Sequence, residues 1–142
     1  MGITRRSALA LGGAGIISVS AFPLGSAFAM TTEAQAFIDE FTGGADVVEG
    51  GVTLTAPELA ENGGSVPISV LADGAKSILI IAEGNPAPKI ITFNFGELSG
   101  KSEASTRIRL AKSQDLMAIA KMADGSFKSG IFSIEVTVGG CG

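Results

Sequence analysis

The sequence predicts an all-β domain, an immunoglobulin-like antiparallel β-sandwich of about seven strands with a short N-terminal helix. Three observations support this fold class. Beyond Gly51, apolar and polar residues alternate within short segments, which is the pattern of half-buried strands. Turn sequences rich in glycine, asparagine and aspartate separate these segments at regular intervals. Before Gly51, one stripe of apolar residues repeats with the period of a helix.

The helix is expected to begin near Thr32. The segment Thr32–Gln35 has the form of a capping box, with Thr32 as the N-cap and the Gln35 side chain returning to it. Gly43 and the glycine after it are suited to end the helix. Spacing at i, i+3, i+4 and i+7 places four apolar residues on one face, which we interpret as a packing surface: Ala34, Phe37, Ile38 and Phe41.

Seven later segments have the length and patterning of strands, as an immunoglobulin-like sandwich requires. Alternation is clearest at Ser105–Leu110, where threonine, isoleucine and leucine alternate with serine and two arginines. Pro67 indicates an edge strand or the start of a strand, because proline has no amide hydrogen to donate. The seven segments are Val52–Thr55, Val66–Leu71, Ile78–Ala82, Ile91–Phe95, Ser105–Leu110, Leu116–Met122 and Phe132–Val138.

Two of these strands are apolar toward both faces. Ile78–Ala82 and Leu116–Met122 lack the alternation expected of a sheet that is covered on one side only. Two explanations stay open at this point. The strands are central and lie under loops or under the N-terminal helix, or a second protein covers one outer face of the sheet.

The sequence divides into a leader, one domain and a short tail. Arg5-Arg6 precedes a weakly apolar stretch, and Ala27–Ala29 supplies the small residues that a signal peptidase accepts. We expect residues 1–29 to be a twin-arginine signal peptide that is removed, which predicts a periplasmic protein. Removal leaves 113 residues (142 − 29), enough for one domain at 30–138 and an arm at 139–142.

Composition excludes several classes of function. The chain has no histidine and one cysteine, which excludes Ser-His-Asp and Cys-His catalysis, an internal disulfide and multi-cysteine metal sites. We expect no metal and no cofactor. Residues 30–142 carry 8 basic side chains (10 minus Arg5 and Arg6) against 14 acidic ones, with no basic cluster. Nucleic-acid binding is therefore not expected, nor is membrane association once the leader is gone.

Cys141 is the candidate functional residue. Glycine flanks it at Gly139, Gly140 and Gly142, and chain ends are seldom held in a core. Three residues beyond the last strand, it can extend about 10 Å from the domain. With a thiol pKa near ~8.5, about 3% is thiolate at pH 7. We expect a flexible arm that presents a substrate-loaded thiol to other enzymes, so the protein itself is a carrier and not an enzyme.

The leader, the small β domain and the terminal Val138–Gly142 resemble the SoxY family of sulfur-carrier proteins. Further resemblance lies in Glu61–Val70, Ala82–Pro88, Arg107–Leu116 and Ala120–Phe127. The resemblance implies an immunoglobulin-like fold and a companion subunit, SoxZ. It also implies sulfur intermediates held on Cys141 as a cysteine S-thiosulfonate, with Sox pathway enzymes that load, oxidise and hydrolyse them. The family tail usually ends Gly-Gly-Cys-Gly-Gly, and this chain ends one glycine earlier.

Two other classes of protein are compatible with the same residues. A periplasmic structural or interaction domain could use Cys141 only for an intermolecular disulfide, and sulfur adducts in a mass spectrum would favour the carrier instead. A thiol oxidoreductase normally has a second cysteine or a site that lowers the thiol pKa, and the sequence shows neither.

Overall fold

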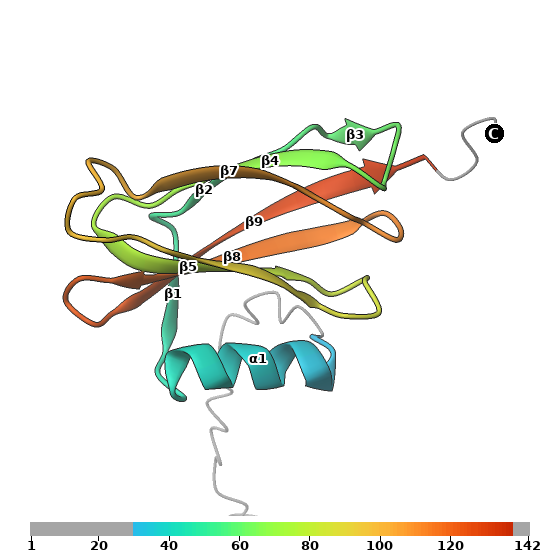
Figure 1. Cartoon of the computed structure of the whole chain (residues 1–142). Coiled ribbons are helices and arrows are strands. Elements are labelled where there is room, and N and C mark those ends of the chain that lie inside the picture. Colours follow the sequence, from blue (N-terminus) through green and yellow to red (C-terminus); the bar gives the residue numbers. More distant parts are fainter. Residues whose placement is uncertain (1–29, 138–142) are drawn as a thin grey trace, which may run out of the picture.

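The computed structural model describes residues 30–137, and within this range it confirms the predicted all-β sandwich with one N-terminal helix (Figure 1). The elements in chain order are α1 (Thr32–Thr42), β1 (Val47–Glu49), β2 (Thr53–Thr55), β3 (Leu59–Ala60), β4 (Val66–Leu71), β5 (Ala75–Ala82), β6 (Lys89–Asn94), β7 (Glu103–Ile108), β8 (Gln114–Met122) and β9 (Phe127–Val136). In these residues no helix is long and apolar enough to cross a membrane.

The strands form two sheets that face each other. The larger sheet has the order β1-β9-β8-β5-β6, with β3 also paired to β9, and the smaller sheet has the order β2-β4-β7. Figure 1 shows the smaller sheet on one side of the larger sheet and α1 on the other. The seven predicted strands pair antiparallel with one another, whereas the short strands β1 and β3 pair parallel to β9. The sequence did not indicate β1 and β3, which have three and two residues and pair only with β9.

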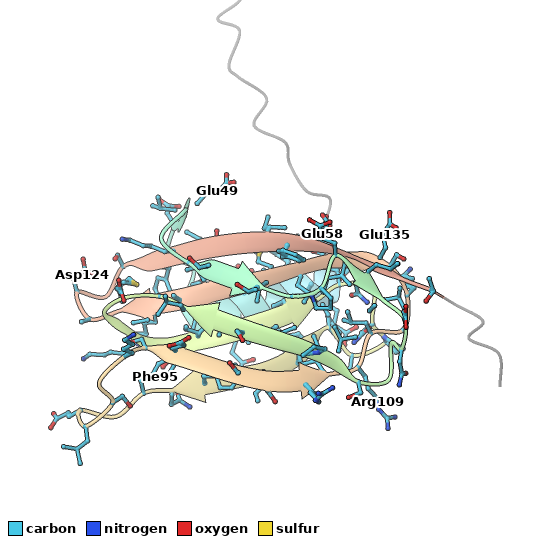
Figure 2. The ribbon with its side chains drawn as sticks, turned by 90° about the horizontal axis from the view of Figure 1, so that it is seen from above. Glu49, Glu58, Phe95, Arg109, Asp124 and Glu135 are labelled. Carbon is cyan, nitrogen blue, oxygen red and sulfur yellow. The ribbon has the colours of Figure 1, made fainter. Side chains whose placement is uncertain are left out.

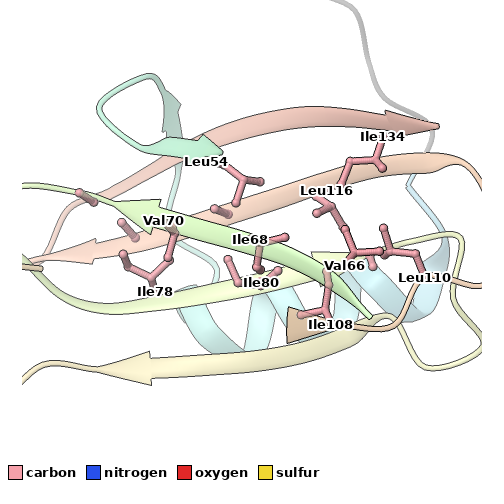
Figure 3. Packing of buried hydrophobic residues seen from close by; sticks show 14 of the residues in the cluster. Leu54, Val66, Ile68, Val70, Ile78, Ile80, Ile108, Leu110, Leu116 and Ile134 are labelled. Carbon is pink, nitrogen blue, oxygen red and sulfur yellow. The ribbon is translucent and has the colours of Figure 1, made fainter. Parts of the chain in front are cut away.

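The main core fills the space between the two sheets. From β4, Val66, Ile68 and Val70 point inward and meet Ile78 and Ile80 of β5, all of them 3% exposed or less (Figure 3). Their period of two is the one that the alternation in β4 predicts. Each of these isoleucines contributes on the order of 2 kcal/mol by leaving water.

Helix α1 covers the outer face of the larger sheet. Leu79 and Ile81 of β5 and Ile119 of β8 are buried there in a second cluster with Ala34 and Ile38 of the helix. At the rim of this cluster the rings of Phe41 and Phe127 meet edge to face at 5.9 Å, and the Lys89 ammonium lies 5.7 Å from the Phe37 ring. The helix therefore accounts for the apolar outer faces of both strands, and these faces no longer indicate a partner protein.

The predicted helix start is wrong by one residue. Thr31 is the N-cap, with extended dihedral angles, and its hydroxyl accepts a hydrogen bond from the Ala34 amide at 3.2 Å. The Gln35 side chain donates to Asp39 and does not return to a cap. Both threonines can cap a helix, and the Gln35 amide already donates to the Thr31 carbonyl oxygen at 3.0 Å, so the helix begins one residue earlier than predicted. Gly43 ends the helix as predicted, at φ 64°.

Two strand predictions gain detail from the pairing. Pro67 is the second residue of β4. It precedes Ser69–Leu71, the only part of β4 that pairs with β2. The prediction that Pro67 marks the start of a strand is therefore confirmed. Strand β9 begins at Phe127, five residues before the predicted start. A Cβ at Gly130 would clash with the carbonyl oxygen of Val52, so glycine is needed in this part of β9 and interrupts the apolar alternation.

Candidate functional site

The predicted site residues Cys141, Gly139, Gly140 and Gly142 lie outside the described residues. The last described residue is Thr137, which directly follows β9 and lies two residues before the predicted arm. Cys141 is four positions beyond Thr137, a distance of at most about 14 Å in a fully extended chain. Any side chain of the same domain that the Cys141 thiol can contact therefore lies within about that distance of Thr137.

Hydrogen bonds hold the end of β9 on both sides. The amide and the hydroxyl of Thr137 both donate to the carbonyl oxygen of Ala60, at 3.1 and 3.2 Å. On the other side, the Val136 amide donates to the Ser113 hydroxyl at 2.8 Å, and that hydroxyl is 3.3 Å from the Val136 carbonyl oxygen. The arm thus starts from a fixed point, because β3 and the loop before β8 both bind the last residues of β9.

Asn85 joins the loops beside this point. Its amide nitrogen donates to the carbonyl oxygen of Arg109 at 2.7 Å, and its side-chain oxygen accepts from the Ala111 amide at 2.9 Å. The Leu110 amide donates to the carbonyl oxygen of Gly63 at 2.7 Å. The backbone on both sides of Arg109 is therefore braced, which fixes where this arginine leaves the loop.

A groove lies next to the end of β9. We call it the root groove; its volume is about 280 Å³ and it is lined by Gly63, Gly64, Asn85, Pro86, Arg109, Leu110 and Ala111. A Cβ placed on Gly63 would lie 2.9 Å from Cγ1 of Val136 and 2.5 Å from the Leu110 carbonyl oxygen. Gly63 thus allows the groove to begin in contact with Val136. The root groove shares Asn85, Pro86 and Arg109 with a second hollow of about 480 Å³ between β6 and β7.

Charge is distributed unevenly around the end of β9. Glu58 and Glu135 lie on one side of it and Arg109 on the other (Figure 2). The Arg107 guanidinium adds positive charge near the root groove, where it is 3.4 Å from the Ser65 hydroxyl. No carboxylate is among the described residues that line the root groove or the hollow between β6 and β7.

One carboxyl group at this end of the sandwich has an unusual environment. Burial, together with the negative charge of Asp115, raises the pKa of Glu83 above its ordinary value of 4.5. One oxygen of Glu83 is buried without a hydrogen-bond partner. Residues 30–137 hold no group of three His, Cys, Asp or Glu side chains placed to bind a metal. Within residues 30–137, this end of the sandwich thus provides a hydrogen-bonded anchor and a groove beside it.

Comparison with known proteins gives the family. The family model described as "Sulfur oxidation protein SoxY" matches residues 38–141, a range that includes Cys141. The chain belongs to the SoxY family. A solved SoxY, the sulfur carrier protein from Chlorobium limicola f thiosulfatophilum, superposes with a TM-score of 0.66 at 28% identity. That match covers 75% of this chain and 97% of the Chlorobium SoxY.

More distant structures share the fold alone. A superoxide reductase (neelaredoxin) from Ignicoccus hospitalis has a TM-score of 0.53 at 17% identity. This match covers 62% of the present chain and 81% of the reductase. No curated protein matches the sequence at a significant level.

The structure adds functional candidates that the sequence did not single out. Three of the four stretches that resemble SoxY, at Glu61–Val70, Ala82–Pro88 and Arg107–Leu116, meet around the end of β9. The fourth, Ala120–Phe127, forms the turn between β8 and β9 at the opposite end. The sequence analysis used these stretches only for the family resemblance, and it missed Arg109 and Asn85 because their proximity to the end of β9 depends on strand pairing.

Proposed function

We propose that this protein is a covalent carrier of sulfur intermediates in periplasmic thiosulfate oxidation. Cys141 holds the intermediate as a cysteine S-thiosulfonate and presents it to partner enzymes. The observation that supports this best is that the SoxY family match extends through Cys141, while the chain leading to it is hydrogen-bonded as far as Thr137. A short tail on a fixed base is suited to delivery, because the base can dock on an enzyme while the thiol enters its active site.

The chemistry of loading requires a second protein. Joining the thiol to thiosulfate follows R–SH + S₂O₃²⁻ → R–S–S–SO₃⁻ + H⁺ + 2 e⁻, so a new sulfur–sulfur bond forms as two electrons and a proton leave. The chain has no histidine to take the proton and no second cysteine to take the electrons. A partner enzyme with an electron acceptor must therefore supply the oxidation, and this chain acts as a substrate carrier without catalytic groups of its own.

The proposed companion is a SoxZ-like subunit that forms a heterodimer with this chain, and Sox pathway enzymes are the further partners. Membership of the SoxY family supports both. Because α1 already covers the outer face of the larger sheet, the companion binds elsewhere on the domain. Size-exclusion chromatography of the mature chain with and without its companion tests this, and a monomer that ignores the companion contradicts it.

Periplasmic export by the twin-arginine route is the proposed location. The support is the spacing of Arg5-Arg6 and Ala27–Ala29 in the leader, which lies outside the described residues. Changing both arginines to lysine is expected to retain the uncleaved precursor in the cytoplasm. Normal appearance of the cleaved protein in the periplasm would count against this route.

The carrier role is tested by Cys141→Ser in a reconstituted thiosulfate-oxidising system. The substitution is expected to abolish turnover while folding is unchanged, because the described sandwich, as far as Thr137, is held by contacts that do not involve residue 141. If the thiol served only an intermolecular disulfide, the serine variant would lose the covalent dimer and keep its turnover.

A further inference from the structure

We propose that Asn62 is a site of spontaneous covalent modification, at which the side chain deamidates to aspartate and isoaspartate through a cyclic imide with Gly63. This chemistry does not require the carrier function. Asn62 lies in the turn between β3 and β4, at the end of the sandwich where β9 finishes (Figure 1). Three features of the turn support the assignment: the residue that follows the asparagine, the hydrogen bonds around it, and the space left for the product.

The reaction needs a free backbone amide on the residue after the asparagine. The Gly63 nitrogen, once it has lost its proton, attacks the side-chain carbonyl carbon of Asn62, and a new C–N bond closes a succinimide ring as ammonia leaves. Water then opens the ring at either of its two carbonyl groups and gives aspartate or isoaspartate. The net change is the replacement of an amide by a carboxylate, with water consumed and ammonia released, and it requires no oxidant and no cofactor.

The turn presents the two reacting groups to each other. Asn62 is exposed, and its side-chain oxygen accepts a hydrogen bond from the Gly64 amide at 2.9 Å. This bond folds the side chain back over the peptide unit of Gly63, which brings the carbonyl carbon toward the nucleophile and makes it more electrophilic. Within residues 30–137 the Gly63 amide takes part in no hydrogen bond, and glycine has no side chain to hinder ring closure. The nitrogen that must react is therefore free in the folded protein.

The other two asparagines of the chain lack a free amide at the following residue. Asn85 precedes Pro86, and proline has no amide hydrogen to lose. Asn94 precedes Phe95, whose amide donates to the Lys76 carbonyl oxygen at 2.9 Å and is therefore held within the sheet. Both residues thus serve as internal controls, because each has the same side chain without the nucleophile.

The turn has little room for the isoaspartate product. Isoaspartate lengthens the backbone by one CH₂ group directly before Gly63. The Gly63 carbonyl oxygen accepts from the Leu110 amide at 2.7 Å. A Cβ placed on Gly63 would lie 2.5 Å from the Leu110 carbonyl oxygen and 2.9 Å from Cγ1 of Val136, so a lengthened backbone cannot bulge toward β9. We therefore expect isoaspartate to displace Gly63 from Leu110 and to loosen this end of the sandwich.

The test is peptide mapping by mass spectrometry after the folded protein has been incubated in mildly alkaline buffer. We expect the peptide that contains Asn62 to gain about 1 Da and to separate into two products. Conversion at Asn62 should be at least about tenfold faster than at Asn85 or Asn94, where the attacking amide is absent or held. Asn62→Gln, whose longer side chain would have to close a larger ring, should remove the change.

Two results would overturn the assignment. One is conversion at Asn62 that is no faster than at the other two asparagines. The other is a rate in the folded protein more than about tenfold below the rate in protein unfolded with guanidinium, because the turn would then protect Asn62 instead of leaving it reactive.

A second experiment tests the structural consequence. Anion exchange separates the modified protein, because each product carries an additional negative charge. Its urea unfolding is compared with that of Asn62→Asp, which has the same charge and a backbone of normal length. We expect the modified fraction to unfold at a lower urea concentration than Asn62→Asp, by an amount that grows with its content of isoaspartate. Equal midpoints would overturn the inference that isoaspartate loosens this end of the sandwich.

Discussion

Truncating Ile38 tests whether α1 is part of the folded domain. Ile38 is 6% exposed and lies in the cluster with Leu79, Ile81 and Ile119. The Ile38→Ala substitution removes three carbon atoms from this contact, which at ~0.8 kcal/mol per buried carbon predicts a loss of about 2.4 kcal/mol. A helix at the surface can shift to fill part of the cavity, which keeps the additional cost small. The free energy of unfolding should therefore fall by about 2 to 3 kcal/mol, near the low end for truncation of a buried isoleucine.

The assay is urea unfolding followed by circular dichroism, since the chain has no tryptophan or tyrosine. Ile38→Val should lose about 1 kcal/mol in the same experiment. Glu40→Ala, on the exposed side of the same helix, is the control and should change the free energy of unfolding by less than about 0.5 kcal/mol. If Ile38→Ala is as stable as the Glu40 control, the helix does not stabilise the sheet, and the apolar outer face again requires a partner protein.

Three further predictions concern the end of the sandwich where the arm begins. Gly63→Ala should lower the free energy of unfolding by about 1 to 3 kcal/mol, because its Cβ would lie 2.5 Å from the Leu110 carbonyl oxygen. Gly96→Ala is the control: its Cβ meets nothing within 4 Å, and urea unfolding should show little change. Glu83→Gln should raise the free energy of unfolding at pH 7, because a pKa that is raised in the folded protein means that folding disfavours the charged carboxylate. The gain should vanish well below pH 4.5, where Glu83 is protonated in the folded and the unfolded protein. A gain that persists there would refute the proposed unfavourable charge. Gly139→Val should lower, without abolishing, turnover with partner enzymes by restricting the backbone and widening the arm, and an unchanged rate would remove the argument from a narrow tail.

The parts of the fold that could be predicted are those that depend on local pattern. Val66, Ile68 and Val70 alternate with polar neighbours and are buried together, and the helix stripe at Ala34 and Ile38 packs as a unit. The short strands β1 and β3 could not be predicted, because they exist only through pairing with β9. The start of β9 could not be predicted for a related reason. Gly130 interrupts the apolar alternation, and it is required because the Val52 backbone, from another part of the chain, lies against it.

The candidate site divides in the same way. Cys141 could be proposed from composition and position, as the single thiol between glycines near the end of the chain, and it stays a prediction because it lies outside the described residues. The root groove could not, because Gly63, Asn85 and Arg109 come from three separate loops that strand pairing brings together. For the strands that are apolar toward both faces, β5 and β8, the sequence pattern correctly predicted burial on both faces. Only the structure shows that α1 is what covers the outer face.

The most direct test of the carrier role is mass spectrometry of the Cys141 peptide during turnover in a reconstituted thiosulfate-oxidising system. A covalent carrier predicts that this peptide gains the mass of one S₂O₃ group when thiosulfate is supplied. When the hydrolysing enzyme is added, the step R–S–S–SO₃⁻ + H₂O → R–S–SH + SO₄²⁻ + H⁺ should remove the mass of SO₃ and leave one added sulfur on the peptide. Cys141→Ser should show neither the added mass nor turnover. Thiosulfate oxidation at the wild-type rate by the serine variant, or turnover during which Cys141 never carries sulfur, would contradict the proposed function.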